Sequence, residues 1–236
     1  MTESQPSSET PLASIVIPVR NEEKYMQQCI DSLKKLDYPP EHLQIIFADG
    51  MSEDKTRDIA RNADCQVVDN PEMKVSSGRN AGFAASNGQI VAFADADCLF
   101  HKHWLKNALV HLKNPNVAGV GGPTKVPADQ NTFGKGVGLF FDLAGLLGIT
   151  VHRSSIPKIY ETLDLPGCNC LYKKEALETV MPTSTLLATN EDVEMNAKIR
   201  DNGFKLFMTP DVIVEHYKRT TASGLWRQMY RFAIGR

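Results

Sequence analysis

The stretch "QIVAFADADC" (residues 89–98) joins a run of apolar residues to two carboxylates, Asp95 and Asp97. A continuous apolar run of this length predicts a strand that is buried on both faces, as in a parallel sheet covered by helices. An unpaired carboxylate is costly to bury. The two acids therefore raise the question of which group offsets their charge at the end of such a strand.

Three further apolar runs precede this strand and alternate with helical patterns. They are "ASIVIPV" (residues 13–19), "LQIIFAD" (residues 43–49) and "CQVVD" (residues 65–69). Short strands that alternate with helices predict βαβ units and a largely parallel sheet. The pattern changes from residue 119, where "GVGGPTKVP" is too rich in glycine and proline for a helix.

The second half of the chain is less regular. Residues 136–151 predict a partly buried helix, and a second helix is expected from Asn190 to about Asp201. Two short strands follow, "FKLFM" and "VIVEHY", with shorter connections than those of the first half. We therefore expect a mixed sheet in which the first half binds a nucleotide-like ligand and the second half binds another substrate.

Composition limits the classes of protein to consider. The chain has 236 residues, of which 42% are hydrophobic and 23% are charged, as in ordinary soluble globular proteins. Its net charge of −2 argues against a general nucleic-acid binder, which would usually be basic. The five cysteines are odd in number and lack zinc spacing along the sequence, and no signal peptide is visible, so a reducing cytoplasm is expected. No run of eighteen apolar residues predicts a transmembrane helix.

Polar residues follow three of the expected strands, in "PVRNEE" (residues 18–23), "ADGMS" (residues 48–52) and "DADC" (residues 95–98). In open parallel sheets, ligands bind beyond the carboxyl ends of the strands. Asp49 taken alone has a simpler interpretation, as the acceptor of an Asx turn or a helix cap. Two carboxylates at a strand end can hold Mg²⁺ or Mn²⁺ together with substrate phosphates.

Glu191, Asp192 and Glu194 open the later helix, in "NEDVEM". Acids at a helix N-terminus complement the helix dipole, which would explain them structurally. A carboxylate on this turn that faces the strand ends could instead serve as a general base. A dinucleotide-binding Gly-x-Gly-x-x-Gly and a phosphate-binding G-x-x-x-x-G-K-[ST] are both absent, which disfavours those two classes.

Four ordered motifs carry a resemblance to inverting glycosyltransferase family 2, which has the GT-A fold. They are "SIVIPVRNEEKYMQQCIDSL", "IIFADGMSEDKT", "GRNAGFAASNGQIVAFADADC" and "NEDVEMNAKIRDNGFKL". "VGGPTKV", "LPGCNCLYKKEAL" and "LWRQMYRFAIGR" resemble more narrowly the exopolysaccharide members similar to the succinoglycan glucosyltransferase. The resemblance covers residues 14–236. The Q-x-x-R-W motif of processive synthases is absent, so processive synthesis is not expected.

The resemblance implies roles for particular residues. Asp95, Ala96 and Asp97 form the family's D-x-D, with Asp95 and Asp97 binding Mg²⁺ or Mn²⁺ and the donor diphosphate. His216 would be a further metal or diphosphate contact, although it also fits a surface histidine at a strand end. Asp192 would be the catalytic base, with Glu191 as the alternative. The residues implied for the nucleotide-sugar site are Pro18, Arg20, Glu22, Asp49, Arg79, Asp95 and Ala96.

The resemblance also implies an organisation and a location. We expect an α/β protein with the GT-A fold, a Rossmann-like and mostly parallel central sheet with helices on both faces, and a mixed acceptor-side part. Residues 1–11 form a disordered lead-in, residues 12–222 form one domain (12–118 for the nucleotide sugar, 119–222 for the acceptor), and residues 223–236 form a C-terminal amphipathic helix.

The expected reaction transfers a sugar from a nucleoside diphosphate donor, with a UDP-sugar favoured, to a lipid-linked saccharide. It would take place at the cytoplasmic membrane surface, without nucleic acid, and the chain would be the soluble part of a longer membrane protein. Trp, Tyr and several arginines in residues 223–236 are typical of a helix that lies at a membrane interface, and equally of one packed on the domain. Two alternatives remain: a sugar-phosphate nucleotidyltransferase and an inactive nucleotide-sugar-binding module.

Overall fold

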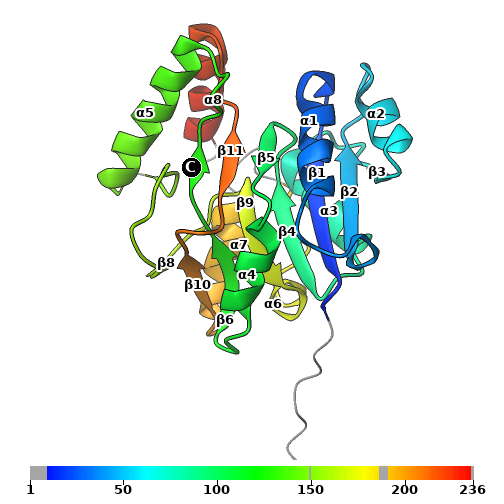
Figure 1. Ribbon diagram of the computed structural model, residues 1–236, viewed down its shortest axis with the longest axis vertical. Coiled ribbons are helices and arrows are strands. Elements are labelled where there is room, and N and C mark those ends of the chain that lie inside the picture. Colours follow the sequence, from blue (N-terminus) through cyan, green and yellow to red (C-terminus); the bar gives the residue numbers. More distant parts are fainter. Residues whose placement is uncertain (1–9, 149, 186–190, 235–236) are drawn as a thin grey trace, which may run out of the picture.

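A computed structural model describes residues 10–148, 150–185 and 191–234 of the chain. Most of the expected lead-in, residues 1–9, and the expected helix start at Asn190 lie outside these described residues. The main sheet has eight strands in the order β3-β2-β1-β4-β9-β6-β10-β8, and a smaller sheet has the order β5-β11-β7. Figure 1 shows helices on either side of the main sheet, with α5 and α8 together at its upper end.

The strands of the main sheet are β1 (Ala13–Val19), β2 (Leu43–Asp49), β3 (Gln66–Asp69), β4 (Ile90–Ala94), β6 (Val117–Gly121), β8 (Tyr160–Thr162), β9 (Asn169–Lys173) and β10 (Lys205–Met208). Those of the small sheet are β5 (Cys98–Phe100), β7 (Thr124–Lys125) and β11 (Val214–His216). The helices are α1 (Glu23–Lys34), η1 (Pro40–His42), α2 (Thr56–Asn62), α3 (Val75–Ala84), α4 (Trp104–Leu112), α5 (Thr132–Leu146), α6 (Lys174–Glu178), α7 (Glu191–Asp201) and α8 (Ala222–Ile234).

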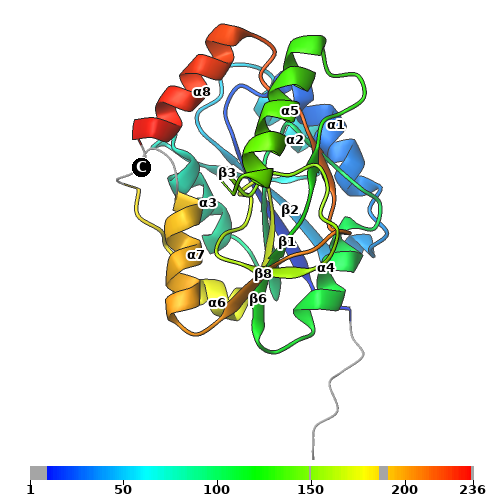
Figure 2. The same cartoon turned by 90° about the vertical axis from the view of Figure 1, so that its left-hand side faces the viewer.

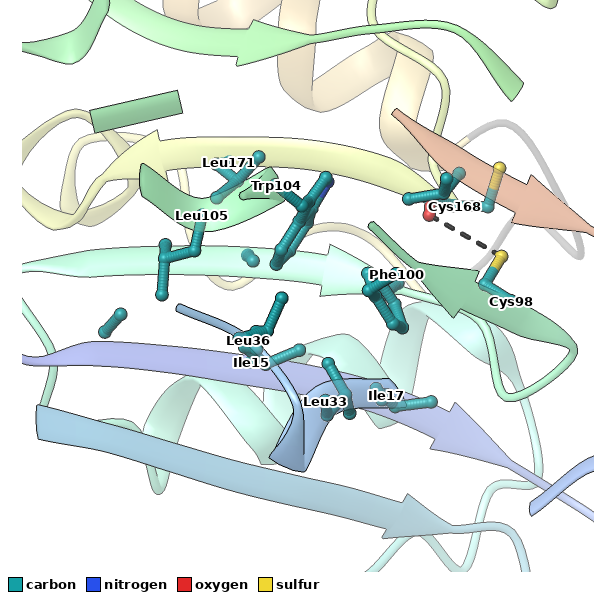
Figure 3. Close-up of a cluster of buried hydrophobic side chains, with 14 of the residues drawn as sticks. Ile15, Ile17, Leu33, Leu36, Cys98, Phe100, Trp104, Leu105, Cys168 and Leu171 are labelled. Carbon is teal, nitrogen blue, oxygen red and sulfur yellow. Dashed lines mark hydrogen bonds between the residues drawn. The ribbon is translucent and has the colours of Figure 1, made fainter. Parts of the chain in front are cut away.

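Alternation along β1 divides the core into two layers. Ile15 and Ile17 face a cluster that includes residues of α1 and α4, whereas Val16 faces a second cluster that includes residues of α6 and α7. Successive side chains of a strand point to opposite faces, so a strand covered on both faces is apolar throughout. This confirms the expected central sheet with helices on both faces, and all five residues of β4 are buried. Figure 3 shows the first cluster around Trp104.

Helix α1 illustrates how a helix attaches to this sheet. Its buried residues are Met26, Cys29, Ile30 and Leu33. The spacing of three, four and seven residues places them on one face of a helix. The same side chains belong to the core cluster that contains Ile15 and Ile17 of β1. The remaining face is polar, so burial of one stripe fixes the helix on the sheet.

The second half of the chain inserts its strands into the same sheet. Strand β9 lies between β4 and β6 and is antiparallel to both. Strand β10 is parallel to β6 and antiparallel to β8. The expected mixed sheet is therefore confirmed. This insertion brings residues before β9 next to the D-x-D that follows β4.

The small sheet forms at the point where the main sheet ends. Strand β5 begins immediately after Asp97 and pairs antiparallel with β11, with Cys98 opposite His216. The backbone N–H of Tyr217 donates to the carbonyl of Asp97 at 3.0 Å. The pairing therefore carries a residue from the end of the chain to the D-x-D turn.

Helices α5 and α8 lie at one end of the molecule (Figures 1 and 2), and both carry exposed apolar side chains. Leu146 is 72% exposed and Trp226 is 73% exposed. The segment before α8 is tied to the start of α5, because Nδ2 of Asn131 donates to the carbonyl of Thr220 at 3.2 Å. Within the part of the chain that the structure describes, no helix combines the length and the apolar character needed to cross a membrane.

Candidate functional site

The site lies where β1 and β4 separate. The ladder between these strands ends at the pair Val16 and Phe93, whereas β1 continues alongside β2 as far as Val19. The chain leaves β1 toward β2 and β3 and later returns to β4 on the other side, so this is the topological switch point at which open sheets bind ligands. The loops that follow β1 and β4 therefore flank one opening.

Pro18 fits this opening because it has no N–H group to donate to a sheet. It lies two residues beyond the last pair between β1 and β4, so no hydrogen bond to β4 is lost there. Helix α3 approaches Pro18 closely at Gly78. A Cβ atom at Gly78 would lie 2.9 Å from Cβ of Pro18, so this contact requires glycine. The close approach places the next residue, Arg79, beside the opening.

The loops after β1 and β2 are held together by side-chain hydrogen bonds. Asn21 has a positive φ of 55°, a conformation that asparagine tolerates better than most residues. Its N–H donates to Oγ of Ser52 at 2.9 Å, and its Oδ1 accepts from the N–H of Glu53 at 2.8 Å. The neighbouring N–H of Glu22 donates to Oγ1 of Thr56 at 2.8 Å. These bonds join the ends of β1 and β2 into one wall, on which Arg20 is exposed.

Asp49 is fully buried at the end of β2. Its Oδ2 accepts from the N–H of Ser52 at 3.1 Å and from Nη1 of Arg57 at 3.0 Å. The contact with Ser52 is the local turn that the simpler interpretation of Asp49 predicted. Oδ1 is also buried, however, and has no hydrogen-bond partner among the described residues. One buried acceptor of Asp49 is therefore free to receive a hydrogen bond from a bound group.

The D-x-D residues form the turn between β4 and β5. Oδ1 of Asp97 lies 3.1 Å from Nε2 of His216, and the two side chains are 12% and 14% exposed. Ligand atoms of Asp95, Asp97 and His216 all lie within 4.8 Å of one another. Carboxylate oxygens suit Mg²⁺ and Mn²⁺, and an imidazole extends the set toward transition metals. The donor set therefore fits a divalent cation.

The pKa values in this cluster reflect its burial and its excess of carboxylates. Burial, with Cys168 and Asp97 nearby, raises the pKa of Asp95 to about 7. Burial opposes ionisation of Asp97 too, but His216 outweighs it and holds the pKa of Asp97 below its usual range. Burial and Lys218 lower the pKa of His216, yet Asp97 and Cys168 prevail and raise it to about 10. Burial and Asp97 likewise raise the pKa of Glu22 to about 7.

A second group of charged residues lies around Arg79. Nη1 of Arg79 lies 2.7 Å from Oε1 of Glu191, and both side chains are almost fully buried. Burial acts to lower the pKa of Arg79, but Glu191 and Asp192 outweigh it and raise that pKa. Nη2 of Arg79 also donates to the carbonyl of Gly167 at 3.1 Å. Glu191 is therefore committed to an ion pair inside the protein.

Asp192 is half-buried, and its Oδ1 accepts a hydrogen bond from the adjacent N–H of Val193 at 3.0 Å. A Cβ atom at Gly167 would lie 2.5 Å from Oδ2 of Asp192 and 2.6 Å from Nη2 of Arg79. A side chain at this position would force Asp192 or Arg79 to shift, so glycine suits the point where the segment before β9 passes this carboxylate. Of the two acids of the "ED" pair, Asp192 is the one whose carboxylate is outside the close ion pair with Arg79.

The structure brings the expected site residues into neighbouring groups. Glu22, Asp95, Asp97 and His216 interact with one another, and Arg79, Glu191 and Asp192 form the second group. Arg79 also feels the charge of Asp95, so the two groups lie near each other. Ala96 is a partial exception, because its side chain is buried in the first core cluster.

Sequence reasoning did not select Arg219, Gly167 or Cys168. Arg219 acts electrostatically on both Glu22 and Asp97. The run "HYKR" after β11 was the only available indication of it. Gly167 and Cys168 precede β9 in "LPGCNC", and their position depends on the antiparallel insertion of β9 beside β4.

The chain was compared with known proteins. The family described as "Glycosyl transferase family 2" matches residues 14–181. The glycosyltransferase AglE of Haloferax volcanii is 26% identical over 238 residues, which cover 98% of this chain and 74% of that protein. A Methanococcus voltae enzyme, dolichyl N-acetyl-alpha-D-glucosaminyl phosphate 3-beta-D-2,3-diacetamido-2,3-dideoxy-beta-D-glucuronosyltransferase, is 24% identical over 246 residues, covering 94% of this chain and 72% of that protein.

A solved structure supports the fold independently. The mannosyltransferase PcManGT from Pyrobaculum calidifontis, in complex with GDP-Man and Mn²⁺, has a TM-score of 0.73 and is 23% identical. The match covers 96% of this chain and 62% of that chain. The sequence motifs, the mixed sheet and the family match agree. The chain belongs to glycosyl transferase family 2 and has the GT-A fold.

Proposed function

We propose that this glycosyltransferase moves a sugar from a nucleoside diphosphate sugar to an acceptor hydroxyl, with inversion at the anomeric carbon. The observation that carries this proposal is the contrast between the acids of α7. Glu191 is bound to Arg79 at 2.7 Å, whereas Asp192 is half-buried beside Gly167 and outside that close ion pair. A carboxylate that is accessible to an acceptor can accept its proton.

The reaction is a single displacement. Asp192 takes the proton of the acceptor hydroxyl while the acceptor oxygen bonds to the anomeric carbon. The bond from that carbon to the diphosphate oxygen breaks on the opposite face, which inverts the configuration. Asp95, Asp97 and His216 would hold Mg²⁺ or Mn²⁺, which when bound offsets the charge on the leaving diphosphate. Arg79 adds a fixed positive charge near the same opening.

The nucleoside would bind at the end of β1 and β2. Asp49 offers a buried Oδ1 without a hydrogen-bond partner among the described residues, which suits an N–H or O–H donor of a base or ribose. Pro18, Arg20 and Glu22 line the same side of the opening. In this proposal residues 12–118 bind the donor and residues 119–222 bind the acceptor within one domain, and a UDP-sugar is the preferred donor.

The acceptor would be a lipid-linked saccharide used at the cytoplasmic membrane face, as in exopolysaccharide assembly. Two observations support this choice. The name of the Methanococcus voltae relative contains a dolichyl-linked sugar phosphate. In addition, α5 and α8 lie at one end of the molecule (Figure 1) and carry exposed apolar side chains, including Leu143 at 53% and Tyr230 at 61%. Such a surface fits a lipid interface.

A donor and acceptor panel tests the proposal. UDP-sugars and GDP-mannose are incubated with Mn²⁺ and polyprenyl-linked saccharides, and the anomeric configuration of any product is determined by nuclear magnetic resonance. Transfer with inversion from a UDP-sugar is expected. Retention of configuration would contradict the mechanism, and transfer only from GDP-mannose would contradict the donor. Nucleotide binding with no transfer to any acceptor would favour the inactive binding module. Synthesis of a nucleotide sugar from a nucleoside triphosphate would favour the nucleotidyltransferase.

A further inference from the structure

Two buried cysteines meet directly behind the D-x-D turn. Cys98 begins β5, and Cys168 precedes β9. Sγ of Cys98 lies 3.8 Å from the carbonyl oxygen of Cys168, and Figure 3 shows the two residues side by side at the edge of the hydrophobic cluster. Both residues are at least 97% buried, with relative exposures of 0% and 3%. All five cysteines are free thiols.

Strand pairing brings a histidine to the same place. Cys98 and His216 are directly opposite each other in the antiparallel pair of β5 and β11. Side chains at such positions extend from the same face of a sheet with their Cβ atoms about 5 Å apart. One ligand atom from each of Cys98, Cys168 and His216 lies within 4.8 Å of the others. The three residues come from three separate segments, so the cluster is a product of the fold.

A second histidine approaches this cluster. Cys98, His152 and His216 all lie near the Cys168 thiol. Nδ1 of His152 is buried and makes no geometrically sound hydrogen bond among the described residues. A buried polar atom without a partner is costly, and a bound ion is one way to satisfy it. Two thiols and two imidazoles form the ligand set that tetrahedral zinc sites use.

We propose that Cys98, Cys168 and His216 form a site for a thiophilic divalent cation such as Zn²⁺, with His152 as the fourth ligand. In a tetrahedral site with Zn–S bonds of about 2.3 Å, the two sulfur atoms are about 3.8 Å apart. The ligand atoms of Cys98, Cys168 and His216 lie within 4.8 Å of one another, so shifts of about 1 Å bring these three to such spacing. Binding releases to solvent the protons that the thiols still hold and the imidazolium proton of His216, because thiolate and neutral imidazole are the ligands.

The simpler interpretation treats both cysteines as small apolar core residues. Cys170 provides the comparison, because it is also fully buried and lies only two residues from Cys168. It belongs to the second core cluster, whereas Cys98 and Cys168 belong to the first and are grouped with His216. The neighbours of Cys98 and Cys168 are therefore metal-ligand types, and those of a purely apolar cysteine need not be.

The proposed site competes with the cation site of the D-x-D. His216 belongs to both ligand sets. One set contains Asp95 and Asp97, and the other contains Cys98 and Cys168. Nε2 of His216 is paired with Asp97 at 3.1 Å, so one imidazole links the two ligand sets. A thiophilic ion that engages His216 therefore weakens binding of a hard cation at the carboxylates.

The test measures metal binding directly on the full chain in the presence of a non-thiol reductant. Zn²⁺ affinity is measured against a chromophoric chelator, and Co²⁺ loading is followed by thiolate-to-metal charge-transfer absorption. Wild type is expected to bind one Zn²⁺ and to show the charge-transfer band. Cys168→Ser should lower the affinity by at least about 10²-fold and remove most of the band, since even outer-shell changes cost 10–100-fold. His152→Ala should lower the affinity by about 10-fold or more.

Cys170→Ser is the matched control, because it removes a buried thiol of the same segment that is not one of the proposed ligands. It should bind Zn²⁺ like wild type. Equal affinities of wild type and Cys168→Ser, or the absence of a charge-transfer band in wild type, would overturn the site. An unchanged affinity of His152→Ala would overturn the fourth ligand. Because Cys168→Ser could disturb folding, a second measurement uses only the wild-type protein. Its Zn²⁺ affinity is measured with increasing concentrations of Mn²⁺. A Zn²⁺ affinity that Mn²⁺ does not change would contradict the proposal that the two sites share His216.

Discussion

Replacement of each acid of the "ED" pair should separate a structural carboxylate from a chemical one. Glu191 and Arg79 form a buried ion pair at 2.7 Å, with side chains 6% and 5% exposed. Removing one partner of such a pair typically costs 3–5 kcal/mol, because the other charge stays buried without compensation. For a chain of 236 residues, 1 kcal/mol shifts Tm by about 2–4 °C. Glu191→Gln should therefore lower Tm by roughly 6–20 °C.

Asp192→Asn should lower turnover strongly and change thermal stability only slightly. Its carboxylate is only half-buried at the start of α7, where loss of the negative charge costs about 0.3–1 kcal/mol. The expected decrease in Tm is then at most about 4 °C. Turnover should fall by at least about 10², because the acceptor hydroxyl loses its base. Glu191→Gln, assayed below its own Tm, should lose less than about 10².

Calorimetry measures Tm and steady-state kinetics measure turnover on the same preparations. The double variant Arg79→Met with Glu191→Leu serves as a control for stability, since a buried pair replaced by apolar residues of similar volume is often neutral. It should recover most of the Tm that Glu191→Gln loses. A Glu191→Gln protein within 2 °C of wild type, or an Asp192→Asn protein with wild-type turnover, would refute the division of roles.

Four further outcomes are expected. Asp97→Ala should keep the fold but lose most transfer, and wild-type activity that persists in EDTA would contradict this. Gly167→Ala should lower turnover and reduce the free energy of unfolding by about 1–3 kcal/mol, because its Cβ would lie 2.5 Å from a carboxylate oxygen of Asp192. Unchanged kinetics and an unchanged Tm would argue against that close approach. Burial and Asp192 raise the pKa of Asp164 from 3.8 to about 6, so Asp164 favours folding below pH 4 and this contribution is lost as pH rises through 6. Asp164→Asn should thus be more stable than wild type at pH 8, by at most about 3 kcal/mol. In thermal melts, this difference in stability should decrease toward pH 5, and a difference that does not change with pH would exclude the Asp164 carboxyl as its cause. Removal of residues 223–236 should reduce co-sedimentation with anionic liposomes at low salt, and equal sedimentation of both chains would remove the role of α8.

The sequence by itself determined the order of the elements in the first half of the chain. The runs at residues 13–19 and 43–49 match β1 and β2 at both ends, because continuous apolar character is a local property of buried strands. The carboxylates after residue 94 were equally visible, since they interrupt an apolar run. The start of α2 lacks such a local signal, because this helix begins at Thr56 without a side-chain cap.

Only the tertiary structure decided which residues meet at the opening. Glu191 and Asp192 are adjacent in sequence, but neighbours on a helix point in different directions, and the packing of α7 turns the first toward Arg79. His216 reaches Asp97 because β11 pairs with β5, and Cys168 reaches Cys98 because β9 inserts beside β4. Such contacts depend on strand pairing between distant segments, for which spacing along the chain holds no signal.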